Sequence, residues 1–461
     1  MDDRERLALA ERAISDGAAD SIEALVSDQH DSLTRFTHNS IHQNLDSLQT
    51  LVQIRAVVDG RAGWASTNGR DDGDLALARN RAIAQARFAP KPIVPVRLPG
   101  KATYAMPQLP YDAATADTPP SARAEAARKI FAVAEQAGAW AAGYVATATS
   151  SVVVANSNGI RAAFSGTIAA TNTKCVAPIA SGYAEAYSRR FADLDTTAVG
   201  ARAAAKATDA GELGTPDIGD WTVIVEPPAL GELVAFLVPH FSAQRIFEGA
   251  SFLADGLGRQ YMGENVTLID DYAHPLFATC PFDGEGSPTE RVTLIENGIA
   301  KDFVTDMEWA ERLERRNTGH YVPGGAEGPY PRAVVVQPGQ RSREDLIAST
   351  KRGILVSRFW YIRVVDQRKA IVTGMTRDGT FLIEDGKLKG GLKNLRFNVR
   401  ILDLLSSCEL SDETVRTGGY SYGMVCPAAR FDRFSVSSVT SYYAGAGTHP
   451  RGGRLLHLGG S

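Results

Sequence analysis

Two stretches of this sequence decide the fold, Arg245-Ile-Phe-Glu-Gly-Ala-Ser-Phe-Leu-Ala-Asp-Gly-Leu-Gly258 and Cys280-Pro-Phe-Asp-Gly-Glu-Gly-Ser-Pro-Thr-Glu-Arg291. The second contains Asp283-Gly-Glu-Gly286, which we interpret as a tight turn because carboxylates bond nearby backbone N–H groups and glycine adopts positive φ without strain. The alternative is a set of paired carboxylates for glycosidic or acid–base chemistry. Its members would be Glu248, Asp283, Glu285 and Glu290.

Length and composition predict a two-domain globular protein. The chain has 461 residues, 44% of them hydrophobic and 22% charged, which is typical of globular proteins. Single cores stop growing at about 250–300 residues, so we expect two domains. We place an N-terminal domain of mixed helix and antiparallel sheet at residues 1–215. A β-rich, barrel- or sandwich-like domain follows at residues 220–461, so the fold class is α+β.

Net charge and the positions of the cysteines limit the possible binding partners and the expected cellular compartment. The net charge is −4 and no dense Lys/Arg block occurs, which argues against nucleic acid. The start is charged and no run of 18 apolar residues occurs, so we expect no membrane segment and a cytoplasmic protein. The cysteines lie far apart without a CxxC pair, which favours free thiols over disulfides. They are Cys175, Cys280, Cys408 and Cys426.

Local patterns predict the N-terminal elements. Asp59-Gly60 lies between two apolar segments and predicts a β-hairpin, as does Asn158-Gly159. The Pro-rich segment Pro90–Pro120 is expected to be extended, either as a linker or as a substrate-side loop. We expect strands at 21–26, 32–36 and 51–58, and helices at 7–14, 74–88, 121–138 and 196–210.

The second half predicts one long helix followed by strands. After a turn-rich boundary at residues 211–219 and a strand at 221–225, residues 228–249 are predicted to be helical. Arg377-Asp378-Gly379 either lines a cleft or turns a hairpin, and we favour the hairpin. A further helix is expected at 342–352, with strands at 354–356, 360–364, 370–376 and 379–383 and a turn at 384–387.

The two opening stretches resemble the second half of the TldD/PmbA family, in which a zinc peptidase subunit, TldD, pairs with a homologous subunit, TldE or PmbA. Ile295-Glu-Asn-Gly-Ile-Ala-Lys-Asp302 and Arg316-Asn-Thr-Gly319 are placed as in the family. The resemblance covers about residues 5 to 440. It implies a β-rich C-terminal domain that curls around a catalytic cleft, with Lys393–Asn398 as a strand edge.

The family's zinc motif is the main point of difference. In TldD, a helix carries His-Glu-x-x-x-His, a cysteine near the C-terminus completes the zinc site, and the glutamate activates water. No His-Glu pair occurs in residues 228–249. Alignment on Glu248-Gly249 puts His240 at the first ligand, Phe241 at the general base and Arg245 at the second histidine. The fixed positive charge of Arg245 would then oppose metal binding.

The remaining histidines and cysteines give only weak metal candidates, His240 and Cys426. His240 follows apolar residues at helical spacing, so we expect it to pack beneath a helix face rather than bind metal. Cys426 stands about where the family's zinc cysteine lies, and we interpret it as a buried structural thiol. His274 and His320 are in Ala-His-Pro and Thr-Gly-His contexts and are predicted to be surface or turn histidines.

The resemblance therefore implies a TldE/PmbA-type subunit without catalytic, cofactor-binding or metal-binding residues of its own. It implies a TldD-like zinc peptidase as partner, with the zinc in that subunit, an unfolded or extended peptide as substrate, and a homodimer when the partner is absent. One alternative is a self-sufficient metallopeptidase that uses His240, Cys426 and a third ligand such as His320 or His274. The other is a non-enzymatic modulator that binds another protein.

Overall fold

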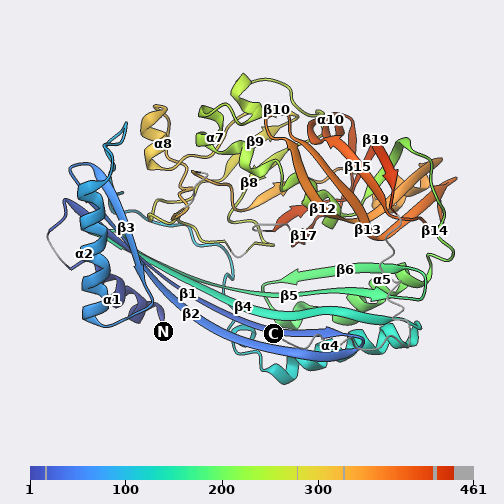
Figure 1. The fold of residues 1–461 in the computed structure, drawn as a ribbon, viewed down its shortest axis with the longest axis horizontal. Coiled ribbons are helices and arrows are strands. Elements are labelled where there is room, and N and C mark those ends of the chain that lie inside the picture. Colours follow the sequence, from blue (N-terminus) through green and yellow to red (C-terminus); the bar gives the residue numbers. More distant parts are fainter. Residues whose placement is uncertain (16–17, 278, 325–327, 419–422, 441–461) are drawn as a thin grey trace, which may run out of the picture.

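Two groups of strands, one N-terminal and one C-terminal, lie one above the other in the computed structural model (Figure 1). The structure describes residues 1–15, 18–277, 279–324, 328–418 and 423–440. The mixture of helices with an N-terminal sheet and C-terminal sheets confirms the predicted α+β, two-domain class. The exact boundaries at 215 and 220 stay a prediction.

The N-terminal sheet is antiparallel throughout and has the order β3-β2-β1-β4-β5-β6. The predicted hairpin turn at Asp59-Gly60 is confirmed, with φ of 51° and 71°. The separate strands predicted at 21–26 and 32–36 are one strand, because β2 pairs with β1 along its whole length and β4 pairs with it from Glu23 to Phe36. The strands are β1 (Ser21–Thr37), β2 (Ser40–Val58), β3 (Arg61–Thr67), β4 (Trp140–Asn156), β5 (Arg161–Val176) and β6 (Ser181–Ser188).

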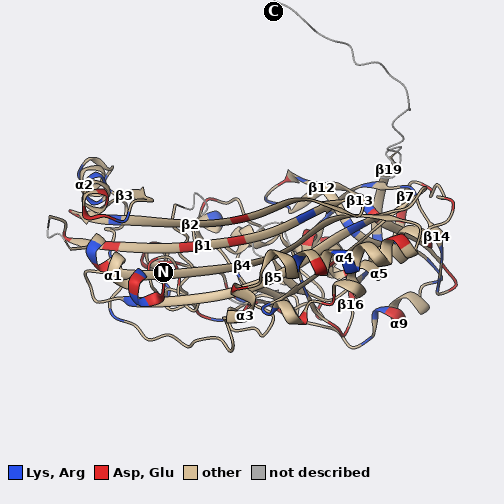
Figure 2. Cartoon of the chain, turned by 90° about the horizontal axis from the view of Figure 1, so that it is seen from below, with Lys and Arg blue, Asp and Glu red and all other residues tan. Residues whose placement is uncertain are grey.

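Helices pack on this sheet in two clusters, one near each end of the long strands (Figure 2). The first two helices share a core with β1, β2 and β4, and two Ala-rich helices share another with β4, β5 and β6. Alanine allows these helices to approach the strands closely. The helices are α1 (Asp3–Ala13), α2 (Asp72–Phe88), α3 (Ala113–Ala116), α4 (Pro120–Gln136), η1 (Phe191–Asp193) and α5 (Thr196–Thr208).

The C-terminal part contains an open sheet of order β10-β9-β8-β11-β18-β17. A second sheet has the order β12-β7-β19-β15-β13-β14. Its strands β12 and β13 also pair with each other, which closes five strands into a ring. The barrel-like prediction is therefore confirmed. The strands are β7 (Gly219–Val225), β8 (Leu268–Asp270), β9 (Val292–Glu296), β10 (Ile299–Ala300), β11 (Val334–Val336), β12 (Arg352–Asp366), β13 (Ile371–Glu384), β14 (Lys387–Gly391), β15 (Leu395–Arg400), β16 (Cys408–Leu410), β17 (Val415–Thr417), β18 (Met424–Cys426) and β19 (Ala429–Val439).

The single helix predicted at 228–249 is wrong, because the structure breaks this segment into three short helices. Pro239 has no N–H to donate and its ring clashes with the preceding turn, so an α-helix cannot continue through it. The helix predicted at 342–352 is shorter and begins after the cap Ser342. The C-terminal helices are α6 (Pro227–Val234), η2 (Val238–Phe241), α7 (Ala243–Phe247), η3 (Phe252–Asp255), α8 (Met307–Arg312), α9 (Arg343–Ala348) and α10 (Ile401–Ser406).

Two further predictions for the C-terminal strands are wrong. Arg377-Asp378-Gly379 does not turn a hairpin but lies within β13, where φ of 51° at Asp378 and 127° at Gly379 produce a bulge opposite β12. Lys393–Asn398 is not a strand edge, because β15 lies between β13 and β19. Both errors arise because strand neighbours are set by tertiary pairing.

The four cysteines are free, as predicted. Among the described residues, no helix is long and apolar enough to cross a membrane.

Candidate functional site

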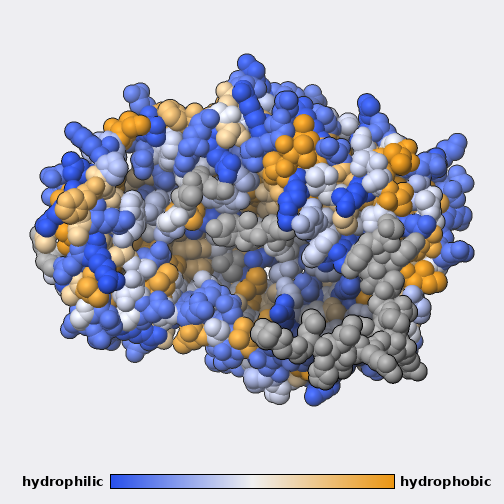
Figure 3. Space-filling view, viewed as in Figure 1, coloured by the Kyte–Doolittle hydropathy of each residue, from blue (hydrophilic) through white to orange (hydrophobic). Residues whose placement is uncertain are grey.

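A cavity of about 830 Å³ lies between the N-terminal sheet and the C-terminal strands, and we call it the cleft. One wall comes from β6 and α5, and the other from the start of α6, the cap of α9 and residues 411–416 up to β17. Figure 3 shows the molecule hollowed between its upper and lower parts. The cleft is rich in charge and is lined by, among others, Glu185, Arg202, Lys206, Glu226, Arg343 and Arg416.

At the edge of β6 that faces the cleft, two backbone carbonyls accept hydrogen bonds from cationic side chains. The carbonyl of Tyr183 accepts a hydrogen bond from Lys206 Nζ at 2.9 Å, and that of Glu185 accepts one from Arg202 Nη2 at 3.4 Å. Both cations come from α5, which packs along β6. Covering an edge strand with a helix and its side chains prevents unwanted strand pairing. A ligand that adds to β6 as a strand would have to displace them.

A buried chain of tyrosine and glutamate links β6 to the end of β17. Tyr183 Oη donates to Glu185 Oε2 at 2.5 Å, and the backbone N–H of Gly418 donates to Glu185 Oε1 at 3.0 Å. Burial raises the pKa of Glu185, and it raises the pKa values of Tyr183 and Tyr187 well above their ordinary range. The carboxylate of Glu185 therefore holds the two sides of the cleft together.

A second buried carboxyl, Glu232, lies on α6 close to this chain. Burial raises its pKa to about 8, against the opposing charge of Arg358, so at neutral pH it is mostly protonated. Its Oε2 accepts a hydrogen bond from the N–H of Phe359 at 2.6 Å. Arg358 packs over the rings of Tyr183 and Trp360 at 4.3 and 5.1 Å. Glu232 can hold or release a proton near neutral pH.

Sequence reasoning missed Glu185 and Glu232. For Glu232 a signal existed, since it is the one acidic residue in the otherwise apolar Pro227–Val234 helix. For Glu185 no local signal existed, because its partner Gly418 is 233 residues away.

A salt-bridge cluster closes the other side of the cleft. Glu226 pairs with Lys206 and, at 3.0 Å, with Arg343 Nη1. Burial opposes ionisation of Glu226, but the two cations outweigh it and hold its pKa below the ordinary value. Arg343 also pairs with Glu344 at 2.6 Å, so two cations and two carboxylates compensate one another here.

The two weak metal candidates are both buried, as their packing interpretations predicted. His240 is 1% exposed, its Nδ1 accepts from the N–H of Phe252 at 3.3 Å, and its ring packs on Phe252. Burial, with the charge of Arg245, lowers the pKa of His240 to about 4. Cys426 is fully buried, with Sγ 3.2 Å from the carbonyl oxygen of Pro227, and burial raises its thiol pKa strongly.

The surface prediction for His320 is wrong, whereas His274 lies in a turn as predicted. His320 is fully buried, with Nδ1 3.0 Å from Thr318 Oγ1 and Nε2 3.4 Å from Asp270 Oδ1. Asp270 on β8 supplies the buried partner that the Thr-Gly-His context did not reveal. Burial opposes ionisation of Asp270, but His320 holds its pKa below the ordinary value.

The turn interpretation of Asp283–Gly286 is confirmed. Asp283 Oδ1 accepts from the N–H groups of Glu285 and Ser287 at 3.1 and 2.9 Å, and Gly286 has φ of 79°. The alternative set of paired carboxylates is not assembled, because Glu290 pairs with Arg316 and Glu248 accepts from Gln244.

Glu285 instead belongs to a buried ionic contact between the two halves, which we call the junction cluster of Glu23, Arg55 and Glu285. Arg55 Nη2 lies 3.2 Å from Glu23 and 3.0 Å from Glu285, and its guanidinium stacks over Tyr321 at 4.7 Å. Burial raises the pKa of Glu23 to about 7.

The Pro-rich segment Pro90–Pro120 also packs against the turn that carries Glu285. Tyr104 packs on Phe282 at 5.0 Å and its Oη donates to the carbonyl of Gly286 at 2.8 Å. The segment thus joins N-terminal helices while lying against the C-terminal turn, and none of its residues lines the cleft.

Within the described ranges, no three His, Cys, Asp or Glu side chains are grouped as a metal site. His449 and His457 lie outside those ranges.

Comparisons with known proteins agree with this architecture. Residues 218–438 match the model of the PmbA/TldA metallopeptidase C-terminal domain. A metalloprotease of Methanocaldococcus jannaschii is 32% identical over 193 residues, which are 41% of this chain and 42% of the relative. Metalloprotease PmbA of Escherichia coli O157:H7 is 27% identical over 180 residues, 36% of this chain and 37% of the relative.

The chain thus spans about half or less of the curated relatives that it matches. The crystal structure of TldE from Thermococcus kodakarensis has a TM-score of 0.85 at 24% identity and covers 95% of this chain and 100% of that chain. This match shows that the whole fold is shared.

Proposed function

We propose, from the premise that the chain belongs to the TldD/PmbA family, that it is the zinc-free partner subunit of a TldD-like metallopeptidase. In this role it shapes a cleft for unfolded or extended peptides, and the catalytic zinc belongs to the other subunit. A shared fold does not by itself establish activity. The role of this chain therefore depends on its own residues.

The state of the two metal-ligand candidates carries the proposal. A histidine binds zinc through a neutral imidazole nitrogen and a cysteine binds it through its thiolate. His240 uses Nδ1 to accept a backbone N–H beside the positive charge of Arg245, and burial strongly disfavours the thiolate of Cys426. No His-Glu pair occurs anywhere in the sequence, so the family's water-activating motif is missing.

The cleft supports the peptide part of the proposal. Its volume of about 830 Å³ suits several residues of an extended chain, and its walls carry both charges and backbone edges. Backbone recognition at the β6 edge, where a peptide would displace Lys206 and Arg202 from the strand carbonyls, accepts many sequences, which fits unfolded substrates.

The test is metal content and cleavage of an unfolded peptide, measured for the purified chain alone and after mixing with a TldD-like protein from the same genome. We expect zinc-free, inactive protein alone and chelator-sensitive cleavage in the mixture. Stoichiometric zinc with cleavage by this chain alone would show a self-sufficient peptidase. Tight binding of a target protein without any effect on cleavage would show a non-enzymatic modulator.

A further inference from the structure

The cations around the cleft differ in how their charge is compensated. Lys206 and Arg343 share the carboxylate of Glu226. Arg416, on β17, donates to the carbonyl of Leu276 at 3.2 Å and packs on the ring of Phe277 at 5.3 Å. Its Nε is buried without a hydrogen-bond partner, and no carboxylate of the described residues lies within salt-bridge distance.

A second arginine, Arg189, does not line the cleft itself, but its charge acts on Arg416. Arg189 follows the end of β6 and donates to the carbonyl of Gln108. Among the described residues it has no carboxylate partner. Burial lowers the pKa of Arg416 to about 10, and the positive charge of Arg189 adds to the effect. Two partly buried guanidinium groups near each other are unfavourable without an anion.

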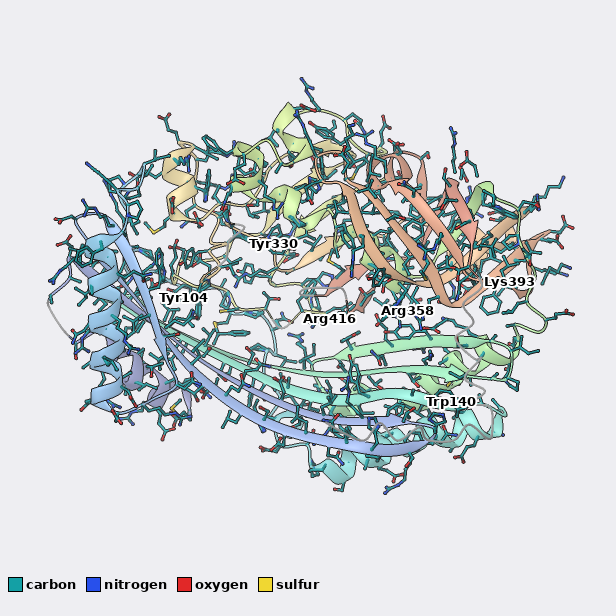
Figure 4. The ribbon with its side chains drawn as sticks, viewed as in Figure 1. Tyr104, Trp140, Tyr330, Arg358, Lys393 and Arg416 are labelled. Carbon is teal, nitrogen blue, oxygen red and sulfur yellow. The ribbon has the colours of Figure 1, made fainter. Side chains whose placement is uncertain are left out.

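Five carboxylates line the cleft, those of Glu185, Glu226, Glu344, Asp412 and Glu413, and Arg416 forms no ion pair with any of them. Three of the five are engaged elsewhere. Glu185 accepts from Tyr183 and Gly418, Glu226 pairs with two cations, and Glu344 pairs with Arg343 at 2.6 Å. Figure 4 shows the side chain of Arg416 between the C-terminal strands and β6, at the level of Arg358. The missing counter-charge is therefore expected from a ligand in the cleft.

We propose that Arg416, with Arg189, binds a carboxylate of the peptide that occupies the cleft. This inference rests on the proposed peptide-binding role and adds the chemistry of the ligand, which is a C-terminal carboxylate or an acidic side chain. A guanidinium matches a carboxylate through two parallel N–H donors, whereas an ammonium acts as a point charge. The aromatic ring beneath Arg416 fixes the plane of these donors.

The experiment measures binding of N-terminally labelled ten-residue peptides to the full chain alone, by fluorescence anisotropy at low salt. Three peptides share one sequence of neutral residues: one ends in a free carboxylate, one in an amide, and one in an amide with a single internal glutamate. We expect the wild-type chain to bind one or both carboxylate peptides roughly tenfold more tightly than the neutral amide. The peptide that binds more tightly shows whether the site recognises a C-terminal carboxylate or an acidic side chain.

Arg416→Gln should reduce this preference to less than about twofold, Arg416→Lys should keep a part of it, and Arg189→Gln should lower it less than Arg416→Gln. Arg128→Gln, an exposed cation on α4 paired with Glu125, is the matched control and should leave the preference unchanged. Melting temperatures show whether each variant is folded.

Equal binding of all three peptides by the wild-type chain, or no binding of any, would overturn the inference, as would an Arg416→Gln variant that is folded and keeps the preference. Cleavage in the mixture with a TldD-like protein tests the proposed function separately, so failure of the carboxylate preference alone leaves that proposal standing.

Discussion

The junction cluster and the cleft both place arginines and carboxylates between the two halves of the molecule. They differ in whether the buried arginine is paired with a carboxylate. At the junction, Arg55 is enclosed by two carboxylates within 3.2 Å. In the cleft, Arg416 has no carboxylate partner among the described residues and faces a cavity of about 830 Å³. Buried arginine with its counter-charge in place is a structural contact, whereas buried arginine without one beside a cavity indicates a binding site.

The largest expected effect comes from breaking the junction. Arg55→Leu would leave Glu23 and Glu285 buried without their cation, and should lower the free energy of unfolding by about 3–5 kcal/mol at pH 8. Urea unfolding measures it. Arg128→Leu, which removes an exposed pair, should cost at most about 1 kcal/mol. Similar losses for both variants would show that the junction cluster is not a stabilising contact.

The second-largest expected effect is the pH dependence of the unfolding free energy that Glu23 causes. Folding raises the pKa of Glu23 from 4.5 to about 7, so between these values the folded chain binds more protons than the unfolded chain, and stability falls as pH rises. Glu23→Gln removes this contribution. Its stability relative to wild type should increase from pH 5 to pH 8, by on the order of 2 kcal/mol. A difference that does not change with pH, measured by urea unfolding, would contradict the burial cost assigned to Glu23.

A smaller effect is expected from the turn that carries Glu285. A Cβ at Gly286 would meet Ile160 Cγ2 at 2.7 Å and Val154 Cγ1 at 3.3 Å, whereas one at Gly138 would meet nothing within 4 Å. Both glycines have positive φ, 79° and 71°. Gly286→Ala should therefore cost about 1–3 kcal/mol more than Gly138→Ala. Equal decreases in melting temperature for the two variants would mean that the halves separate easily at the junction.

The smallest effect is expected in the cleft. Tyr183→Phe removes the hydroxyl that donates to Glu185 and should cost about 0.5–1.5 kcal/mol, because water in the cleft can replace the lost donor. Urea unfolding of this variant beside Arg55→Leu compares the two regions directly. A loss as large as that of Arg55→Leu would show that the cleft wall is as rigidly closed as the junction.

Features that depend on neighbouring residues in the sequence were predictable. Asp59-Gly60 and Asp385-Gly386 both turn hairpins with positive φ, since each signal is contained in two residues. The break of the 228–249 helix was also predictable, because Pro239 stands in its interior. The apolar spacing alone indicates one continuous helix.

Features that depend on distant partners were not predictable from the sequence. His320 is buried because Asp270 lies beside it, 50 residues earlier in the chain. The candidate site depends on the hydrogen bond between Glu185 and Gly418 and on the charge of Arg189 acting on Arg416, and no spacing in the sequence encodes either interaction. The family resemblance implied a cleft beside the C-terminal domain, but the residues that line it were not predicted.

The closed ring of five strands has a consequence for how the protein is made. Its strand β7 pairs with β19, about 200 residues later in the chain, at Val225 and Ala429. During synthesis, the first strand of the ring therefore leaves the ribosome long before its neighbour exists, and its edges stay unpaired in the meantime. Contacts between such distant segments also slow folding. Premature termination before β19 would leave an open sheet edge, so truncated chains should be prone to aggregation.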